Sequence, residues 1–188
     1  MRFGLFGGTF NPVHLGHLRA ALEVKEGFEL SKIFLIPAAL PPHKIPGDVV
    51  DAGDRLQMLN LALEDKAEIS VSDIELKRSG PSYTIDTLRS LYQDFPGARL
   101  CLLLGDDAFN GFASWRDPLG ILELANIAVL RRPNQASPSD PALAELLAER
   151  GVKQLAADRS GQIVFCAVTQ LEIASSDIRQ RIASGRSA

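Results

Sequence analysis

The chain has 188 residues, of which 46% are hydrophobic and 23% are charged, and its formal net charge is −3. These values are typical of one globular domain, which we expect to span residues 1–188, and they exclude a disordered chain. The slightly acidic balance also disfavours a general nucleic-acid binder, which usually carries a basic face, so no nucleic-acid partner is expected.

Strand-like and helix-like segments alternate along the whole chain. In chain order the pattern predicts a strand at 2–6, a helix at 15–27, a strand at 32–37, a loop at 38–50, a helix from Asp51 or Asp54, a strand at 68–73, a helix at 83–94, a strand at 99–104, a turn at 105–107, a helix at 119–125, a strand at 126–130, a polar turn at 133–141, a helix at 142–150, a strand at 162–168 and a helix at 175–184. The helix after residue 50 should turn Leu56, Leu59 and Leu63 inward.

Four or five of these strands are wholly apolar, which indicates a parallel sheet covered on both faces. We therefore predict an α/β fold: a single doubly wound, Rossmann-like domain with a mostly parallel sheet and helices on both faces. Ligands of such folds bind beyond the carboxyl ends of the strands, where the strand order reverses. Cys101 and Cys166 lie in apolar runs and are expected to be buried thiols in a reducing compartment. With neither a signal peptide nor a membrane helix in the pattern, we expect a cytoplasmic protein without a membrane partner, either a monomer or a small homo-oligomer.

Two histidines follow the first predicted strand at the start of the first helix. His14 and His17 are three residues apart, so their imidazoles face the same side of the helix, and Gly16 keeps the backbone open to a close-lying ligand. A helix N-terminus carries partial positive charge and free N–H groups, and two more potential cations there favour an anion. The alternative is that one histidine caps the helix and the other packs in the core.

A similar pattern occurs at the last helix. Ser175 or Ser176 would cap this helix, and Arg179 would lie in its first turn, where the helix dipole disfavours a cation unless an anion is shared. We therefore expect a phosphate site there. A surface arginine that reaches a carboxylate is the alternative.

These segments resemble a known family. GGTFNPVHLGH at 7–17 is similar to the HxGH signature of the nucleotidyltransferases, and its GGTF lead-in is similar to bacterial nicotinate mononucleotide adenylyltransferases. Further similar segments follow in the order of the family: PPHK at 41–44, SYTIDTL at 82–88, LGDD at 104–107 with Trp115, and ASSDIR at 174–179. Two residues depart from the family pattern. Asn11 stands where Asp is frequent, and Ala174, which stands where the family has Ser, cannot donate a side-chain hydrogen bond.

The resemblance implies roles for individual residues. His14, His17 and Arg179 would be catalytic. ATP would be bound by Gly7, Gly8, Thr9, Phe10, Gly16, Gly105, Asp107, Ser175 and Ser176. The acceptor would be bound by His43, Lys44, Tyr83, Thr84, Asp106 and Trp115, the last by stacking on its aromatic ring. From the residues alone, a solvated loop at 43–44, a solvated turn at 106–107 and core packing of Trp115 remain alternatives.

The implied reaction is transfer of the adenylyl group of ATP to nicotinate mononucleotide, which yields deamido-NAD and pyrophosphate in NAD biosynthesis. The acceptor phosphate is already ionised near neutral pH, so the protein need only align two polyanions and neutralise charge. Mg²⁺ is expected to arrive with the ATP phosphates, and no protein-only metal cage is predicted. Two alternatives remain. The first is another nucleotidyltransferase, such as a pantetheine-phosphate adenylyltransferase or a cytidylyltransferase. The second is a nucleotide-binding sensor without catalysis.

Overall fold

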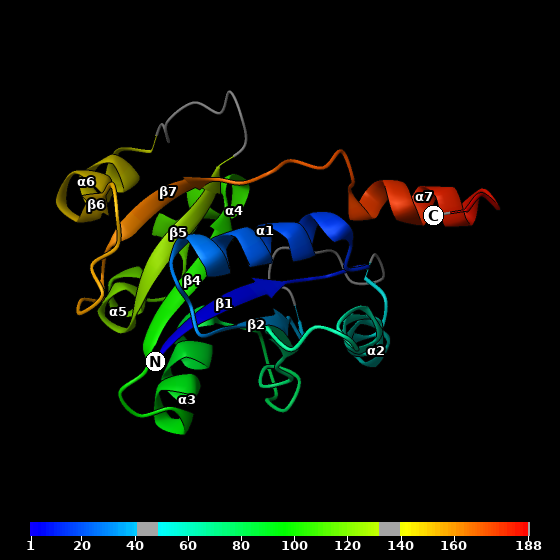
Figure 1. The fold of residues 1–188 in the computed structure, drawn as a ribbon, viewed down its shortest axis with the longest axis horizontal. Helices are drawn as coiled ribbons and strands as arrows, with labels where there is room; N and C mark the ends of the chain where they lie inside the picture. Colours follow the sequence, from blue (N-terminus) through cyan, green and yellow to red (C-terminus); the bar gives the residue numbers. More distant parts are fainter. Residues whose placement is uncertain (41–48, 132–139, 188) are drawn as a thin grey trace.

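A parallel β-sheet forms the centre of the computed structural model, which describes residues 1–40, 49–131 and 140–187 (Figure 1). Within these residues the sheet has seven strands in the order β3-β2-β1-β4-β5-β7-β6, and every pairing is parallel. The strands are β1 (Arg2–Gly8), β2 (Lys32–Pro37), β3 (Ile69–Val71), β4 (Arg99–Gly105), β5 (Ala125–Arg131), β6 (Gly151–Val152) and β7 (Ile163–Ala167). The chain builds outward from β1 through β2 to β3 and then returns to place β4 on the other side of β1. The strand order therefore reverses between β1 and β4.

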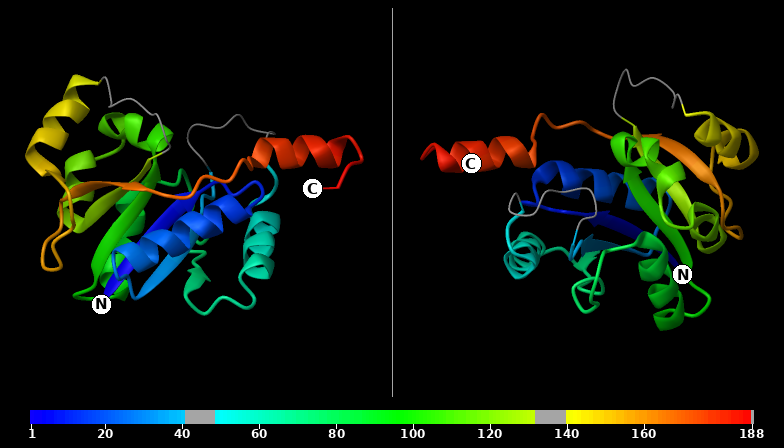
Figure 2. Two further views of the ribbon diagram at one scale, coloured as in Figure 1. Left: turned by 45° about the horizontal axis from the view of Figure 1, so that its top comes forward. Right: turned by 180° about the vertical axis from the view of Figure 1, so that it is seen from behind.

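Helices cover both faces of this sheet, as predicted. The helices are α1 (Leu15–Gly27), α2 (Ala52–Ala62), α3 (Thr84–Asp94), α4 (Asp106–Asn110), the 3-10 helix η1 (Phe112–Ser114), α5 (Pro118–Leu124), α6 (Pro141–Arg150) and α7 (Ser175–Ala183). Helices α1 and α2 pack on one face, while α3 to α6 cover the other, and α7 projects beyond the body of the molecule (Figure 2). In the part of the chain that the structure describes, no helix is long and apolar enough to cross a membrane.

The central strand β4 shows how the sequence fills both layers. Its side chains alternate in direction, so Leu100, Leu102 and Leu104 enter the core under α3 and α5, while Cys101 and Leu103 enter the core under α1. Cys101 is buried and Cys166 is half-buried, and both are free thiols. Burial raises the pKa of Cys101 to about 12 and that of Cys166 to about 11, so neither thiol is reactive near neutral pH.

Most predicted elements are confirmed, including the helix at 15–27 with the same bounds and the strand at 32–37. The turn at 105–107 is wrong: Asp106 and Asp107 form the first turn of α4, where carboxylates favour a helix start, and Phe109 is buried behind them. The short strand β6 was not predicted. Most of the predicted loop at 38–50 and of the polar turn at 133–141 lies outside the described residues.

Helix α2 begins as predicted, but one of its three expected inward leucines is not buried. Asp51 is the N-cap, and its carboxylate accepts a hydrogen bond from the Gly53 N–H at 2.8 Å. Leu59 and Leu63 are buried as predicted, but Leu56 is only half-buried. Arg55 lies in the buried position instead and is 1% exposed.

Candidate active site

A pocket of about 750 Å³ lies at the carboxyl ends of the central strands, beside the point where the strand order reverses. It lies between the N-terminal half of α1 and the connection from β7 to α7, which runs over α1 in Figure 1. Its walls include Phe6, His14, Gly16, His17, Ala20, Gly105, Leu130, Ser175, Asp177 and the connection 168–174. This volume lies within the range of ligand pockets and is large enough for a nucleotide.

The two histidines form a close pair at the start of α1. Their ring centroids are 3.7 Å apart with an interplanar angle of 32°. His14 is the N-cap residue, and its backbone N–H donates to Nδ1 of His17 at 3.2 Å. Because Nδ1 accepts this bond, a neutral His17 carries its hydrogen on Nε2. Nδ1 of His14 is buried against the start of α1, where the backbone N–H of His17 completes a capping box with the His14 side chain.

Burial favours the neutral form of both imidazoles in the free protein. It lowers the pKa of His14, and it lowers the pKa of His17 to about 4, with the neighbouring His14 as a second cause. The first turn of α1 has no acidic side chain that would neutralise the positive end of its dipole. The site therefore combines free helix N–H groups and imidazole groups without a resident carboxylate on that turn, which suits a phosphate.

Small residues and one strained residue support the histidine pair. Phe10 is 3% exposed, and its ring contacts that of His17 edge-on at 5.1 Å between centroids. A Cβ atom on Gly8 would lie 3.1 Å from the Phe10 ring, and one on Gly16 would lie 3.0 Å from Nδ1 of His14. Phe10 has φ of 47°, a left-handed conformation that costs on the order of 1–3 kcal/mol. Gly8 and Gly16 thus leave room for the rings, and Phe10 supports His17 from the core side.

Helix α7 joins the loop before the histidines through the predicted phosphate ligands. Oγ of Ser175 donates to the carbonyl of Pro12 at 2.8 Å, and Nη1 of Arg179 donates to the carbonyl of Asn11 at 2.7 Å. The expected serine cap is wrong, because Ala174 is the N-cap and makes no side-chain hydrogen bond. Since α7 begins at Ser175, Arg179 also lies just beyond the first turn. The hydroxyl of the exposed Ser176 contacts Asp177 instead.

The predicted acceptor residues lie apart from this pocket. Tyr83 and Thr84 begin α3, and the guanidinium of Arg116 lies 4.8 Å from the Tyr83 ring centroid, which brings the segment after Trp115 against α3. Trp115 is half-buried and packs against Phe112, with centroids 5.6 Å apart. Tyr83 and Trp115 pack on the core face under α3 and α5, opposite to the face that carries α1.

The remaining predicted residues lie at the carboxyl ends of the strands or outside the described part of the chain. Gly7 is the second-last residue of β1 and has open space where a Cβ atom would lie, Gly105 lines the pocket, and Asp107 is exposed on α4. Asp106 is 8% exposed, and its carboxylate lies 3.8 Å from Nε of Arg131. Nothing is described for His43 and Lys44.

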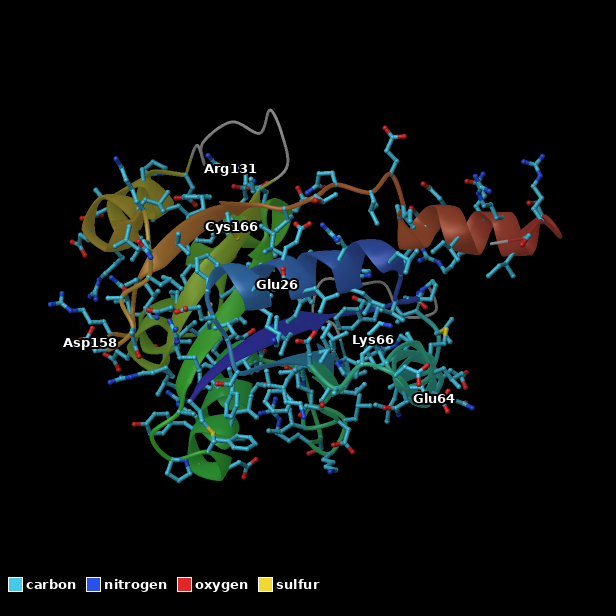
Figure 3. All side chains as sticks on the ribbon, viewed as in Figure 1. Glu26, Glu64, Lys66, Arg131, Asp158 and Cys166 are labelled. Carbon is cyan, nitrogen blue, oxygen red and sulfur yellow. The ribbon has the colours of Figure 1, made fainter. Side chains whose placement is uncertain are left out.

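Two arginines near the site were missed by the sequence analysis. Arg55 donates to the carbonyl of Thr9. Arg131, labelled in Figure 3, ends β5 beside β7, and its guanidinium lies 4.0 Å from the ring centroid of Phe165. An arginine among the leucines of a helix, at Arg55, is a signal that could have been used. The pairing of Arg131, at the end of β5, with Asp106, at the start of α4, leaves no pattern in the sequence.

No group of three or more His, Cys, Asp or Glu side chains could hold a metal ion among the residues that the structure describes. The histidine pair itself offers two nitrogen atoms near an expected phosphate, which is a poor set of donors for Mg²⁺ because this ion prefers oxygen ligands.

Comparisons with known proteins agree with the fold and the sequence motifs. The family described as cytidylyltransferase-like matches residues 5–181. A protein of Pseudomonas syringae pv. tomato, named "Probable nicotinate-nucleotide adenylyltransferase", is 46% identical over 99% of this chain and 85% of its own length. A protein of the same name from Methylococcus capsulatus is 44% identical over 98% of this chain and 90% of its own length.

Solved structures show the same fold. The nicotinic acid mononucleotide adenylyltransferase of Plasmodium falciparum, complexed with NaAD, superposes with a TM-score of 0.71 at 15% identity and covers 95% of this chain and 82% of that one. A second structure of that protein, complexed with APC, has a TM-score of 0.69 at 15% identity, with the same coverage of both chains. At this low identity the likeness concerns the fold alone.

Proposed function

We propose that this chain transfers the adenylyl group of ATP to nicotinate mononucleotide. It belongs to the cytidylyltransferase-like family and, within it, to the nicotinate-nucleotide adenylyltransferases. The products are nicotinate adenine dinucleotide (deamido-NAD) and pyrophosphate. The observation that carries the proposal is the pair His14 and His17 at the N-terminus of α1, on the wall of a pocket of about 750 Å³. The absence of an acidic side chain from the first turn of α1 supports an anionic ligand at this position.

The chemistry requires little more than alignment and charge neutralisation. The 5′-phosphate of the mononucleotide attacks the α-phosphorus of ATP, and the bond to the leaving pyrophosphate breaks. Negative charge then develops on the α-phosphate oxygens and on the pyrophosphate. Nε2–H of His17 donates to an oxygen there, and His14 and the free N–H groups of α1 stabilise the same charge. Each of these donors is held in place before the reaction begins, so little reorganisation is needed.

Helix α7 supplies further donors at the same edge. Arg179 uses Nη1 for the carbonyl of Asn11, and its planar guanidinium has further N–H groups with which it can bind a phosphate. Ser175 lies on the pocket wall, and its hydroxyl exchanges the carbonyl of Pro12 for a phosphate oxygen when ATP is bound. Mg²⁺ would arrive with ATP as part of the substrate and would neutralise charge on its phosphates.

The acceptor is assigned to the other side of the strand ends. Trp115 stacks on the pyridine ring, Tyr83 and Thr84 place the free N–H groups of α3 near it, and Asp106 binds a ribose hydroxyl. We keep the expected binding of ATP by Thr9, Phe10 and Asp107, and that of the acceptor phosphate by His43 and Lys44. We place this reaction in the cytoplasm, in one domain over residues 1–188 that acts as a monomer or small homo-oligomer and binds neither nucleic acid nor membrane.

A pyrophosphate-release assay with ATP and Mg²⁺ tests the proposal against four acceptors: nicotinate mononucleotide, nicotinamide mononucleotide, phosphopantetheine and glycerol phosphate. We expect the highest kcat/KM with nicotinate mononucleotide. Equal or greater kcat/KM with phosphopantetheine or glycerol phosphate would assign the chain to another acceptor. ATP binding without turnover of any acceptor would identify a nucleotide sensor instead.

A further inference from the structure

Arg55 on α2 joins three separate segments of the chain through one buried guanidinium. Its side chain donates to the carbonyl oxygens of Val50 through Nε at 2.9 Å, Thr9 through Nη1 at 2.8 Å and Ala38 through Nη2 at 2.8 Å. The backbone N–H of Val50 in turn donates to Oδ1 of Asn11 at 3.3 Å. Three carbonyl oxygens thus compensate for part of the hydration that a buried cation loses.

These hydrogen bonds hold both neighbours of the strained residue in the histidine loop. Arg55 fixes Thr9, and Val50 fixes Asn11, so Phe10 between them is held in its left-handed conformation from the side of α2. Such a conformation persists in a bulky residue only where the surroundings enforce it. The ring of Phe10 in turn lies against His17. A continuous line of contacts therefore runs from Arg55 through the loop to the catalytic imidazole.

The loop at residues 9–11 is held from two sides, by Arg55 on α2 and by helix α7. On its other side the loop is held by α7, which has no buried residue and whose side chains are expected to turn toward phosphate. The anchor on α2 does not depend on the ligand, because Arg55 is not part of the pocket wall. When the Ser175 hydroxyl leaves the carbonyl of Pro12 for a phosphate oxygen, the hydrogen bonds of Arg55 still keep the loop in place.

We propose that Arg55 is a positioning residue for adenylyl transfer, which holds the loop at residues 9–11 so that His17 and His14 meet the α-phosphate. This role rests on the proposed function, and Arg55 itself touches neither substrate. Its contribution should appear in kcat, because a misplacement of about 1 Å in a catalytic group can lower a rate by about a hundredfold.

Arg55→Lys is the direct test, because lysine keeps the positive charge but has a single ammonium that cannot serve three carbonyls in fixed directions. We expect kcat to fall by about tenfold to a hundredfold, with a smaller change in the KM for ATP. The matched control is Leu59→Ala, one turn later on the same helix, which is also fully buried but makes no contact with the loop through hydrogen bonds. This control should lower Tm while kcat, measured below that Tm, stays within about twofold.

A second measurement is independent of activity. The chain has three histidines, so imidazole NMR can follow each of them through a pH titration. In the wild type, His17 should stay neutral to nearly pH 4. In Arg55→Lys its titration midpoint should move toward 6.5 as the ring gains solvent, whereas in Leu59→Ala it should not. Asn11→Ala, which removes the hydrogen bond from Val50, should shift His17 in the same direction and serves if Arg55→Lys does not fold.

The outcomes are separable. A normal His17 titration and normal kcat in Arg55→Lys, with only Tm lowered as in Leu59→Ala, would overturn the positioning role. If the folded Arg55→Lys protein is not obtained, an unchanged His17 titration in Asn11→Ala would overturn it as well. A wild type without turnover of any acceptor would refute the proposed function, while the titration would still decide whether Arg55 holds His17 in place.

Discussion

His17 accepts a hydrogen bond in the free protein, and we expect it to gain a proton when ATP binds. Replacing His17 with asparagine should keep the hydrogen bond and abolish the proton uptake. Oδ1 of asparagine lies where Nδ1 of histidine lies, so it can accept the N–H of His14 that now bonds to His17 at 3.2 Å. Asparagine cannot take up a proton. The variant therefore keeps the start of α1 and removes the titration.

The size of the expected proton uptake follows from the surroundings of His17. Burial lowers its pKa to about 4 in the free protein, so at pH 5.5 only about 3% of His17 is protonated. The added proton must go to Nδ1, so a bound phosphate has to offset the burial and also accept the N–H that His14 now donates to Nδ1. The pKa would then return to the ordinary 6.5 or higher, and about 90% of His17 would be protonated. Binding of MgATP at pH 5.5 should thus take up roughly 0.9 proton more in the wild type than in His17→Asn.

Isothermal titration calorimetry in two buffers of different ionisation enthalpy measures this uptake. The difference between wild type and variant cancels the titration of ATP itself, which is common to both. An equal uptake in both proteins would refute the reasoning, because it would mean that no phosphate approaches His17. Tighter binding at pH 5.5 than at pH 8 should accompany the uptake in the wild type and be weaker in His17→Asn.

Three further outcomes can be checked with simple variants. His14→Ala should lower kcat by about 10²–10³ with little change in Tm, and a fall in Tm large enough to explain the lost rate would argue against a transition-state role. Trp115→Ala should raise the KM for the mononucleotide about tenfold while the KM for ATP stays constant; a lower Tm with unchanged KM would identify core packing. Urea unfolding should show that the free energy of unfolding falls by up to about 3 kcal/mol more in the wild type than in His17→Asn between pH 6.5 and pH 4. The sign follows because the unfolded His17 binds a proton below pH 6.5 and the folded one does not, and parallel curves would contradict it.

Local patterns in the sequence were sufficient for the fold class and for the histidine pair. Apolar strands such as 99–104 can be buried only in a sheet with two covered faces, so alternation with helices implies the doubly wound arrangement. His14 and His17 occupy the N-cap and N3 positions of one helix, so their closeness follows from the local geometry of a helix start. The same local reasoning failed at Ser175, because it counted the serine as a cap and could not know that its hydroxyl bonds to Pro12, 163 residues away in the chain.

Contacts between distant segments were beyond any reading of neighbouring residues. The burial of Arg55 in place of Leu56 depends on the carbonyls of Thr9 and Ala38, which become acceptors only when the ends of β1 and β2 lie beside α2. The low pKa of His17 likewise depends on the body of protein around the ring. Residue identity and spacing are properties of the chain, and they specify helices, strands and the chemical groups at the site. Burial, hydrogen-bond partners and protonation depend on what packs against each group, and those neighbours come together only in the folded molecule.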